Sequence, residues 1–226
     1  MDFKNLSYKF KGQKEYLLNN ISFSLIENNI NFLIGENGSG KTTLIDSILG
    51  LRKSDINQTI KKKNYIYINQ MLPMLDSIRV MDVASLILGI SNGKLHLSIK
   101  NLKDYVDTYT YNFLKNNWNK YYYELSGGNQ KLLQLLLFLQ VDKKYVILDE
   151  PTAFLDRENA IKLFNVVKHK KNRTYMIVTH DIRDLRMFED YQILLLDNKK
   201  IKLKIKKREF VDENYESKFL KYFTKY

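Results

Sequence analysis

A short glycine-rich segment constrains this chain more than any other feature of its sequence. The segment runs from Gly35 to Thr42 and reads GENGSGKT. The run Ile30–Ile34 before it is almost wholly apolar, which is typical of a strand covered on both faces. Helical character follows from Thr42 to Leu51. A buried strand, a glycine-rich turn and a helix in this order favour an α/β fold with a mainly parallel sheet.

The same segment predicts a chemistry, because it matches the phosphate-binding pattern G-x-x-x-x-G-K-[ST]. Glycines let backbone N–H groups curl around phosphate oxygens without a Cβ in the way. The following helix N-terminus adds unpaired N–H donors and a favourable dipole. Lys41 supplies a charge for the β- and γ-phosphates, and the Thr42 hydroxyl can bind Mg²⁺. We expect a nucleotide here, bound by Gly35, Asn37, Gly38, Ser39, Gly40, Lys41, Thr42 and Thr43.

A second apolar strand ends in two carboxylates. The stretch Lys144–Glu150 reads KYVILDE, and alternation along a strand sends the side chains of Asp149 and Glu150 in different directions. Asp149 is suited to hold Mg²⁺, directly or through water. Glu150 can then face the γ-phosphate and polarise the attacking water. The structural alternative is a polar turn at the end of the strand, since Pro151 follows.

The rest of the chain mixes strands and helices. Residues 75–122 carry apolar side chains at helical spacing and predict a helical insert, with a break between helices at Gly89–Gly93. The predicted strands are Leu6–Phe10, Ile21–Leu25, Tyr65–Asn69, Tyr145–Leu148 and Tyr175–Thr179. The predicted helices outside the insert are Leu132–Val141 and Ala160–Lys168. A hairpin is expected over Gln192–Ile205, with its turn at Asp197-Asn198.

Composition narrows the classes of protein. The chain has 226 residues, which suggests one large domain or one domain with an insert. Cysteine is absent, so a disulfide framework, a thiolate zinc site and a thiol nucleophile are excluded. No apolar run approaches the ~18 residues that a membrane span needs. The net charge of +12 indicates an anionic partner but does not choose among nucleic acid, lipid headgroups and phosphorylated ligands.

Several motifs in one order make the chain resemble a known family. Residues 125–129, LSGGN, resemble the signature LSGGQ of the ATP-binding cassette (ABC) ATPases. Residues 150–156, EPTAFLD, resemble the end of that family's Walker B motif and its D-loop. Gln70 lies where the Q-loop glutamine is expected, and His180 resembles the switch histidine. The resemblance covers the chain from about residue 2 to about residue 205.

The resemblance implies the P-loop NTPase fold of ABC ATPases. This fold has a mainly parallel core sheet, an N-terminal antiparallel β subdomain and a helical insert. We therefore expect one ABC ATPase domain over residues 1–226. Its nucleotide-binding core would comprise 1–70 and 126–205, its helical subdomain 71–125, and a short C-terminal tail 206–226.

The resemblance also implies roles for residues outside the phosphate-binding loop. Gln70 and His180 join Glu150 as catalytic residues, and Gln70 joins Thr42 and Asp149 as a Mg²⁺ ligand. The adenine-stacking aromatic is Phe10 or its neighbour Tyr8, unless these rings belong to the core. Ser126, Gly127, Gly128 and Asp156 are expected to contact nucleotide, the first three on the ATP of a second copy. Asn129 replaces the usual signature glutamine, and we expect function to survive this change.

The function that follows is that of an ATP-hydrolysing subunit of a transporter. Two copies would close around ATP and Mg²⁺ and drive a separate membrane permease, which in this family contacts the helical insert and the segment Met71–Ser77. The subunit would lie in the cytoplasm at the inner face of the membrane, with no span of its own and no specific nucleic-acid partner. The choice between import and export stays open, with a slight lean toward metal-chelate importers from Ile78–Val83 and Pro151–Asp156.

Two alternatives to the transporter belong to other classes. One is a soluble ABC ATPase without a permease, of the iron–sulfur cluster assembly type. The other is a nucleic-acid-binding module, which rests on charge alone and would bind with a steep dependence on salt. The lysine-rich stretch Lys199–Lys207 fits a solvated edge strand, with contact to anionic lipid as its alternative.

Overall fold

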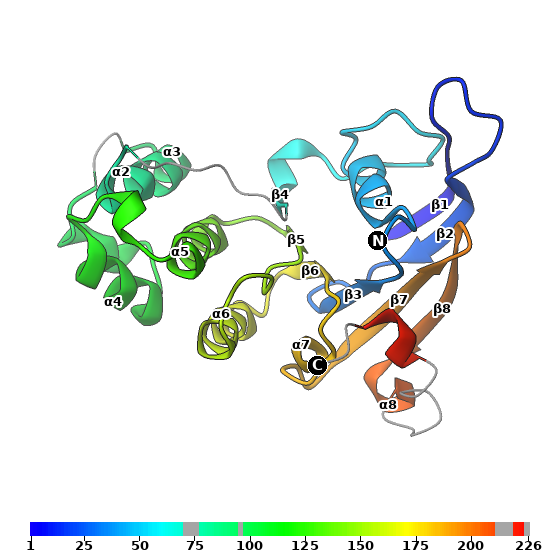
Figure 1. Cartoon of the computed structure of the whole chain (residues 1–226). Coiled ribbons are helices and arrows are strands. Elements are labelled where there is room, and N and C mark those ends of the chain that lie inside the picture. The colour runs from blue at the N-terminus through cyan, green and yellow to red at the C-terminus, as the bar shows by residue number, and fades with distance from the viewer. Residues whose placement is uncertain (70–76, 95–96, 211–218, 224–226) are drawn as a thin grey trace. The chain divides into compact units, whose positions relative to one another are not determined.

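The computed structural model describes residues 1–69, 77–94, 97–210 and 219–223. These divide into two compact units (Figure 1). Unit 1 comprises residues 1–67, 143–151 and 172–226, and unit 2 comprises 68–142 and 152–171. Unit 2 thus takes in residues 126–142 and 152–171 as well as the helical insert. Gln70 lies outside the described residues, and so does the expected permease-contacting segment Met71–Ser77 except for Ser77.

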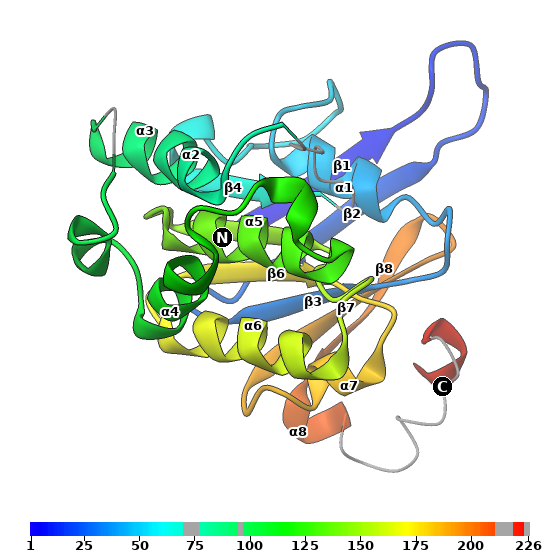
Figure 2. The same cartoon turned by 60° about the vertical axis from the view of Figure 1, so that its left-hand side comes forward.

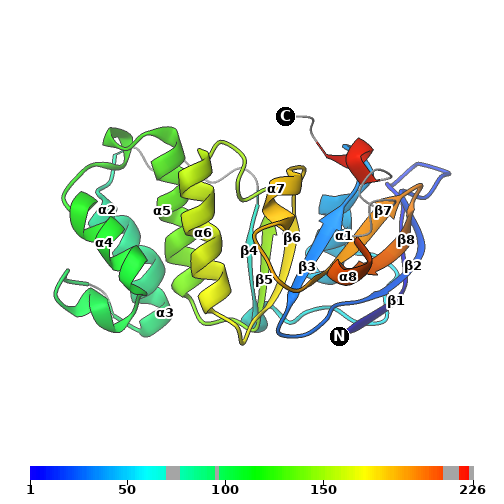
Figure 3. The same cartoon turned by 90° about the horizontal axis from the view of Figure 1, so that it is seen from below.

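Unit 1 is built around a six-stranded sheet whose strand order is β4-β5-β6-β3-β7-β8 (Figure 3). Pairing of β3 with β6 and β7, and of β5 with β6, is parallel, whereas β7 and β8 are antiparallel. The strands are β3 Ile30–Ile34, β4 Tyr65–Ile68, β5 Tyr145–Asp149, β6 Thr174–Val178, β7 Tyr191–Asp197 and β8 Lys200–Lys206. Every residue of β3, β5 and β6 is buried, as the apolar runs predict. The mainly parallel α/β sheet is therefore confirmed.

A separate two-stranded antiparallel sheet precedes this core. It pairs β1, Asp2–Tyr8, with β2, Leu18–Ser24. The predicted first strand, Leu6–Phe10, was displaced toward the C-terminus, because Asn5 adopts a left-handed φ of 58° and its neighbours shift register. The inward rings Phe3 and Phe23 lie 5.1 Å apart in the core of unit 1. Each buried aromatic of this kind contributes about 1.5–3 kcal/mol.

The described residues of unit 1 include three short α-helices. They are α1 Lys41–Ile48, α7 Ile182–Leu185 and α8 Lys207–Phe210. Helix α1 ends earlier than predicted because Gly50 follows its last turn with a left-handed φ of 68°. The side chains of Leu44, Ile45 and Ile48 cover the core face of α1.

Unit 2 is helical and has a core of its own. Its α-helices are α2 Val80–Ala84, α3 Ile90–Asn92, α4 Thr108–Asn117, α5 Gly127–Gln140 and α6 Arg157–His169, of which α4, α5 and α6 lie side by side in Figure 2. Asp107, Ser126 and Asp156 cap the N-termini of the last three helices.

The predicted break at Gly89–Gly93 was wrong in position. A π-helical turn, Ser85–Gly89, leads directly into α3, and the helical run ends only at Gly93, whose φ is 67°. Gly89 lies inside the helical run. A glycine is required there because a Cβ would lie 2.3 Å from the carbonyl oxygen of Lys94. Close approach of the backbone, and not a break, therefore explains this glycine.

The hairpin turn also lies one residue further along than predicted. Strand β7 ends at Asp197 and β8 begins at Lys200, so Asn198 and Lys199 form the turn. Both have positive φ, 47° and 64°, which is the conformation of a type I′ turn. Asparagine adopts left-handed φ values at little cost, whereas lysine is strained by them.

This turn gives a stability prediction. Lys199→Gly removes the left-handed strain at the second turn position and should raise the free energy of unfolding by about 1 kcal/mol. For a domain of this size that corresponds to a rise in Tm of roughly 2–4 °C. Thermal denaturation followed by circular dichroism measures the change.

The control is Lys199→Ala, which keeps the strained backbone. It removes only the exposed ion pair between Lys199 and Glu15, 2.7 Å, and such pairs add little to stability. We expect its Tm to equal or fall slightly below that of the wild type. Equal Tm values for the glycine and alanine variants would contradict the strain argument.

Candidate functional site

The glycine-rich loop lies between β3 and α1, as the sequence predicts. Gly38 and Gly40 have left-handed φ values of 79° and 99°. A Cβ on Gly35 would lie 2.4 Å from the carbonyl oxygen of Leu196, so no larger residue fits there. Gly40 is also the N-cap of α1, and Asn37 and Thr42 are exposed beside it. The loop therefore presents backbone to the outside, at the N-terminus of a helix.

Two polar groups of the loop match an anionic ligand. Lys41 is buried, and its ammonium donates to the carbonyl oxygens of Gly35 (2.8 Å) and Glu36 (3.0 Å). Burial lowers the pKa of Lys41, while the charges of Glu150 and Asp149 act in the opposite direction. The buried Ser39 hydroxyl finds no hydrogen-bond partner among the described residues. A phosphate group would supply the acceptor that Ser39 lacks.

The two carboxylates at the end of β5 have different surroundings. Asp149 is buried, and its Oδ2 accepts hydrogen bonds from the Tyr67 hydroxyl (3.3 Å) and the Thr42 hydroxyl (3.4 Å). Burial raises the pKa of Asp149, and the neighbouring Glu150 charge raises it further. Burial likewise raises the pKa of Tyr67, with Asp149 adding to the effect. Asp149 and Thr42 thus lie together at the loop, as Mg²⁺ ligands would.

Glu150 has a strained backbone. Its φ is 49°, a left-handed value that costs a non-glycine residue free energy, and its N–H donates to the carbonyl oxygen of Val178 (3.0 Å). Its side chain lies beside His180, whose Nε2 is 3.4 Å from Glu150 Oε1. The two proposed catalytic groups, 30 positions apart in the sequence, therefore meet at the ends of β5 and β6.

The loop that carries His180 is fixed locally. The Thr179 hydroxyl donates to Asp184 (2.7 Å) and accepts from the Asp181 N–H (3.0 Å). On its other side, His180 Nδ1 lies 3.3 Å from the carbonyl oxygen of Tyr222. Both ring nitrogens of His180 thus face a defined oxygen.

The two candidate adenine neighbours lie at the end of strand β1, with Tyr8 as its last residue and Phe10 beyond it. Phe10 is 41% exposed, and Tyr8 meets it edge-on with ring centroids 5.3 Å apart. The Arg52 guanidinium lies 5.1 Å from the Tyr8 ring centroid and donates to its hydroxyl at 3.0 Å. The Phe10 ring is thus the more accessible of the two, which agrees with its choice as the adenine neighbour.

The signature-like stretch lies in unit 2. Ser126 caps α5 and accepts from the Asn129 N–H at 3.3 Å, while Ser126 and Gly127 stay exposed. A Cβ on Gly128 would lie 3.3 Å from the carbonyl oxygen of Phe154. The Asp156 carboxylate caps α6 through Asn159 N–H, 2.7 Å. Its expected contact with nucleotide stays a prediction.

Sequence reasoning missed three contributors. Tyr67 could have been suspected from its place on a strand just before Gln70, but its contact with Asp149 spans 82 positions. Lys131 donates to the carbonyl oxygen of Ala153 (2.8 Å) and lies 5.7 Å from the Phe154 ring centroid, so the signature helix supports the D-loop. The Tyr222 carbonyl oxygen left no sequence signal, because every residue has one.

Comparison with known proteins decides the family. A family model described as ABC transporter matches residues 18–153, more than half of the chain. The chain belongs to the ABC transporter family. This membership confirms the resemblance that the motifs predict, and with it the binding of ATP.

Relatives of this ABC protein are subunits of transporters. The zinc import ATP-binding protein ZnuC of Buchnera aphidicola subsp. Schizaphis graminum is 30% identical to it, over 85% of this chain and 79% of that protein. The oligopeptide transport ATP-binding protein OppF of Streptococcus mutans is 27% identical, over 84% and 70%. The energy-coupling factor transporter ATP-binding protein EcfA1 of Staphylococcus aureus is 28% identical, over 85% and 77%.

Solved structures agree on the ABC fold. The structure of an ATP-binding subunit of an ABC transporter matches with a TM-score of 0.74 and 20% identity, covering 97% of this chain and 93% of that one. The dimeric structure of MJ0796, a bacterial ABC transporter cassette, matches with a TM-score of 0.70 and 21% identity, covering 91% and 98%.

The protein is therefore an ABC-type transport ATPase, the ATP-binding subunit of a transporter. This outcome favours the transporter over the ABC ATPase without a permease. No helix in the described parts of the chain is both long and apolar enough to cross a membrane.

The buried carboxylate gives a prediction for the ligand-free protein. Because the pKa of Asp149 is raised on folding, the folded state binds its proton more tightly than the unfolded state does. The stability from that proton is complete below the unfolded pKa of about 3.9 and is lost as the pH rises through the raised folded pKa. At pH 7, Asp149→Asn should therefore raise the Tm of the ligand-free chain by a few degrees.

Differential scanning calorimetry at pH 7 and pH 4 tests this sign. The stabilising effect of Asp149→Asn should shrink as the pH falls, because the wild-type carboxyl then becomes neutral as well. The exposed Asp190→Asn is the matched control and should not reproduce the effect. If the Tm of Asp149→Asn at pH 7 is lower than that of the wild type, the folded protein stabilises the charged form of Asp149, and the prediction is contradicted.

Proposed function

We propose that this subunit binds Mg·ATP at the loop Gly35–Thr42 and hydrolyses it with Glu150 as general base. The observation that carries the proposal is the convergence of Lys41, Asp149, Glu150 and His180 at the ends of three buried strands in one unit. Electrostatics support it, since the charges of Asp149 and Glu150 act on the pKa of Lys41, and those of Glu150 and Lys41 act on the pKa of Asp149. Such clustering of perturbed groups is typical of functional sites.

The phosphates would lie in the loop. The backbone of Gly35, Asn37, Gly38 and Gly40 and the hydroxyls of Ser39 and Thr43 surround them, with Phe10 against the adenine. Lys41 already points across the loop, so its ammonium reaches the β- and γ-phosphates with little rearrangement. Pre-positioned donors of this kind act without reorganisation cost in the transition state.

Thr42 and Asp149 would hold Mg²⁺, together with Gln70. Their side-chain oxygens already lie 3.4 Å apart. The described residues contain no group of three or more His, Cys, Asp or Glu side chains that could hold a metal ion. A small number of protein ligands suits Mg²⁺, which takes its remaining ligands from water and phosphate oxygens. Bound there, Mg²⁺ neutralises charge that develops on the β- and γ-phosphate oxygens.

The attacking water would be polarised by Glu150. Glu150 has a left-handed backbone, and His180 lies beside its carboxylate at 3.4 Å. A positioned general base contributes roughly 10²–10⁴-fold to a rate. His180 would orient Glu150 and contact the γ-phosphate, with Gln70 as the third catalytic residue.

Two copies would form the complete site. Ser126, Gly127 and Gly128 lie at the N-terminus of α5, and their N–H groups would face the γ-phosphate bound to the other copy, with Asp156 on the adjoining D-loop. A dimeric cassette among the matched structures supports this arrangement. Replacement of glutamine by Asn129 leaves the Ser126 cap intact.

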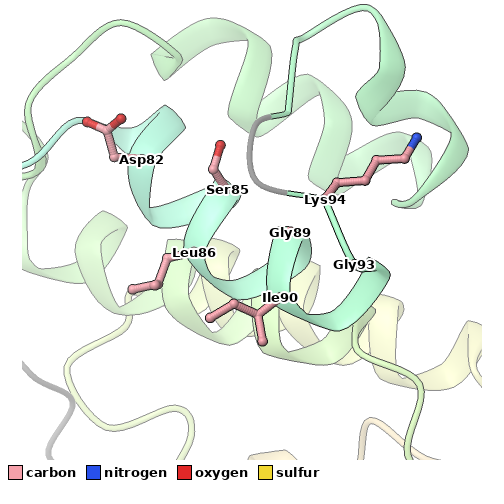
Figure 4. A pocket seen from close by; sticks show the side chains of 7 residues that line it. All are labelled: Asp82, Ser85, Leu86, Gly89, Ile90, Gly93 and Lys94. Carbon is pink, nitrogen blue, oxygen red and sulfur yellow. The ribbon is translucent and has the colours of Figure 1, made fainter.

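The permease partner would dock on unit 2. The described surface of unit 2 includes a cavity of about 650 Å³, which is lined by Asp82, Ser85, Leu86, Gly89, Ile90, Gly93 and Lys94. Leu86 and Ile90, 53% and 75% exposed, project from the same side of the helical run (Figure 4). Apolar side chains this exposed favour contact with a partner. The subunit would thus be peripheral, at the cytoplasmic face of the membrane, where its net charge of +12 favours anionic lipid.

We propose import as the direction of transport. One support is that the relative with 30% identity is a zinc import protein. The other is the stretch Ile78–Val83, which resembles metal-chelate importers. Purification of the subunit with its permease from solubilised membranes, followed by uptake assays in vesicles, tests the partner and the direction together.

Loss of the loop ammonium tests nucleotide binding. Lys41→Ala removes charge-assisted hydrogen bonds of about 1.5–3 kcal/mol and should weaken ATP binding roughly tenfold to a hundredfold. Fluorescence titration with a labelled ATP analogue measures the affinity. Lys204→Ala removes one exposed charge from β8 and serves as the control, with unchanged affinity expected. Unchanged binding by the Lys41 variant would count against the loop.

Loss of the proposed base tests turnover. Glu150→Gln keeps the shape of the side chain but cannot accept the proton of water, so kcat should fall about 10²–10⁴-fold while ATP binding persists. ATP should then trap the dimer, which size-exclusion chromatography with light scattering detects. Glu189→Gln, at an exposed position, is the control. Normal hydrolysis by the Glu150 variant would remove this residue from the role of base.

A further inference from the structure

The C-terminal helical turn of the chain reaches the proposed catalytic site. It comprises residues 219–223, with a 3₁₀ turn over Leu220–Tyr222, drawn in red in Figure 1. The carbonyl oxygen of Tyr222 lies 3.3 Å from His180 Nδ1. The same imidazole faces Glu150 Oε1 with its Nε2 at 3.4 Å. His180 is thus held between the proposed base and the end of the chain.

This turn is anchored by buried aromatic rings. Phe219, Tyr222 and Phe223 are all buried. Phe219 packs on Phe210 of α8 with ring centroids 5.5 Å apart, and on Tyr222 at 6.2 Å. The turn is therefore seated on α8 by the same rings that set the position of its backbone carbonyls.

Charged groups add to the anchoring. Hydrogen bonds from Lys202 and, to a smaller extent, from Tyr222 hold the pKa of the Asp197 carboxyl below its usual range. A hydrogen bond with Tyr222 raises the pKa of Lys221, and the carboxylates of Asp197 and Glu36 add to this shift. Glu36 belongs to the phosphate-binding loop, so the turn lies within electrostatic reach of that loop as well.

The carbonyl contact has a consequence for the imidazole. A carbonyl oxygen only accepts, so the contact at 3.3 Å requires the proton on Nδ1. The orientation of Nε2 is then fixed by this bond on the other side of the ring. The contact therefore sets the orientation of the imidazole and keeps Nε2 on the Glu150 side.

We propose that residues 219–223 are a positioning element for ATP hydrolysis, which orients the His180 imidazole through the Tyr222 carbonyl. The proposal rests on the roles proposed above for His180 and Glu150. No atom of the turn is assigned contact with the reacting groups, so the effect passes through His180 alone. Since the acceptor belongs to the backbone, the element depends on how the turn is seated and not on a side chain at position 222.

The first experiment unseats the turn in the full-length chain. Phe219→Ser removes the ring between Phe210 and Tyr222, and Phe219→Leu keeps an apolar side chain as the matched control. The serine variant should lose about tenfold in kcat, the scale of one hydrogen bond of about 1.4 kcal/mol. The KM for ATP and the ATP affinity should stay within about twofold, because the loop Gly35–Thr42 is untouched. The leucine variant should retain wild-type kcat.

The second readout separates positioning from damage to the fold. In a His180→Ala background, Phe219→Ser should cause no further loss, because the residue through which it acts is gone. A loss that multiplies in the double variant, or a parallel fall in ATP affinity, would overturn the proposal. If Phe219→Ser melts below the assay temperature, Phe223→Ser and Phe223→Leu repeat the comparison at the other end of the turn.

A spectroscopic signature tests the contact at Nδ1 directly. The chain contains three histidines, so ¹⁵N NMR of the imidazoles can be assigned to His180 with the His180→Ala variant. Nδ1 should carry a proton in the wild type and in Phe219→Leu, and this proton should be absent from part of the population in Phe219→Ser. A His180 without a proton on Nδ1 in the wild type would overturn the proposal.

The outcomes distinguish this proposal from the proposed function. A wild-type kcat in His180→Ala would reject the proposed role of His180 in hydrolysis, and the proposed role of residues 219–223 would fall with it. A defective His180→Ala combined with a fully active Phe219→Ser would leave the site intact and reject only the role of the turn.

Discussion

The site depends on one constraint, which is that three fully buried parallel strands end at the same edge of a sheet. Strands β3, β5 and β6 have no exposed residue, so their polar continuations can lie only where the strands stop. Because parallel strands place their carboxyl ends at one edge, the loop after β3, the carboxylates of β5 and the histidine after β6 must converge there. The helices and the outer strands then serve to keep this edge covered and in register.

The converged groups are kept in states that the fold alone disfavours. Asp149 is a buried carboxylate with a raised pKa, Lys41 is a buried ammonium with a lowered one, and Glu150 has a left-handed backbone. Each feature costs stability in the ligand-free protein, and each makes sense for a site that binds a polyanion and a divalent cation. The apolar cluster around Phe3, Phe23 and the buried strands offsets these costs.

Hydrogen bonds from neighbouring residues orient the groups of the proposed site. Tyr67 fixes the Asp149 oxygen that Thr42 also reaches, and Thr179 fixes the turn that carries His180. Lys131 ties the signature helix to the D-loop in the same way. Tyr67, Thr179 and Lys131 were not singled out by any motif, yet they hold residues of the proposed site in place. Residues 219–223 extend this support to the imidazole of His180 from the end of the chain.

The sequence by itself determined the family, the order of the buried strands along the chain and the identity of the motif residues. It could do so because those signals are local: glycines at left-handed positions, apolar runs and capping residues within a few positions of one another. Local signals failed where backbone detail shifted an element, at Asn5, at Gly89 and at the Asn198-Lys199 turn. Only the tertiary structure brought Tyr67 to Asp149 and Tyr222 to His180, across 82 and 42 positions. Contacts of that range follow from the order of the strands in the sheet and from the packing of the aromatic rings, neither of which a pattern along the chain encodes.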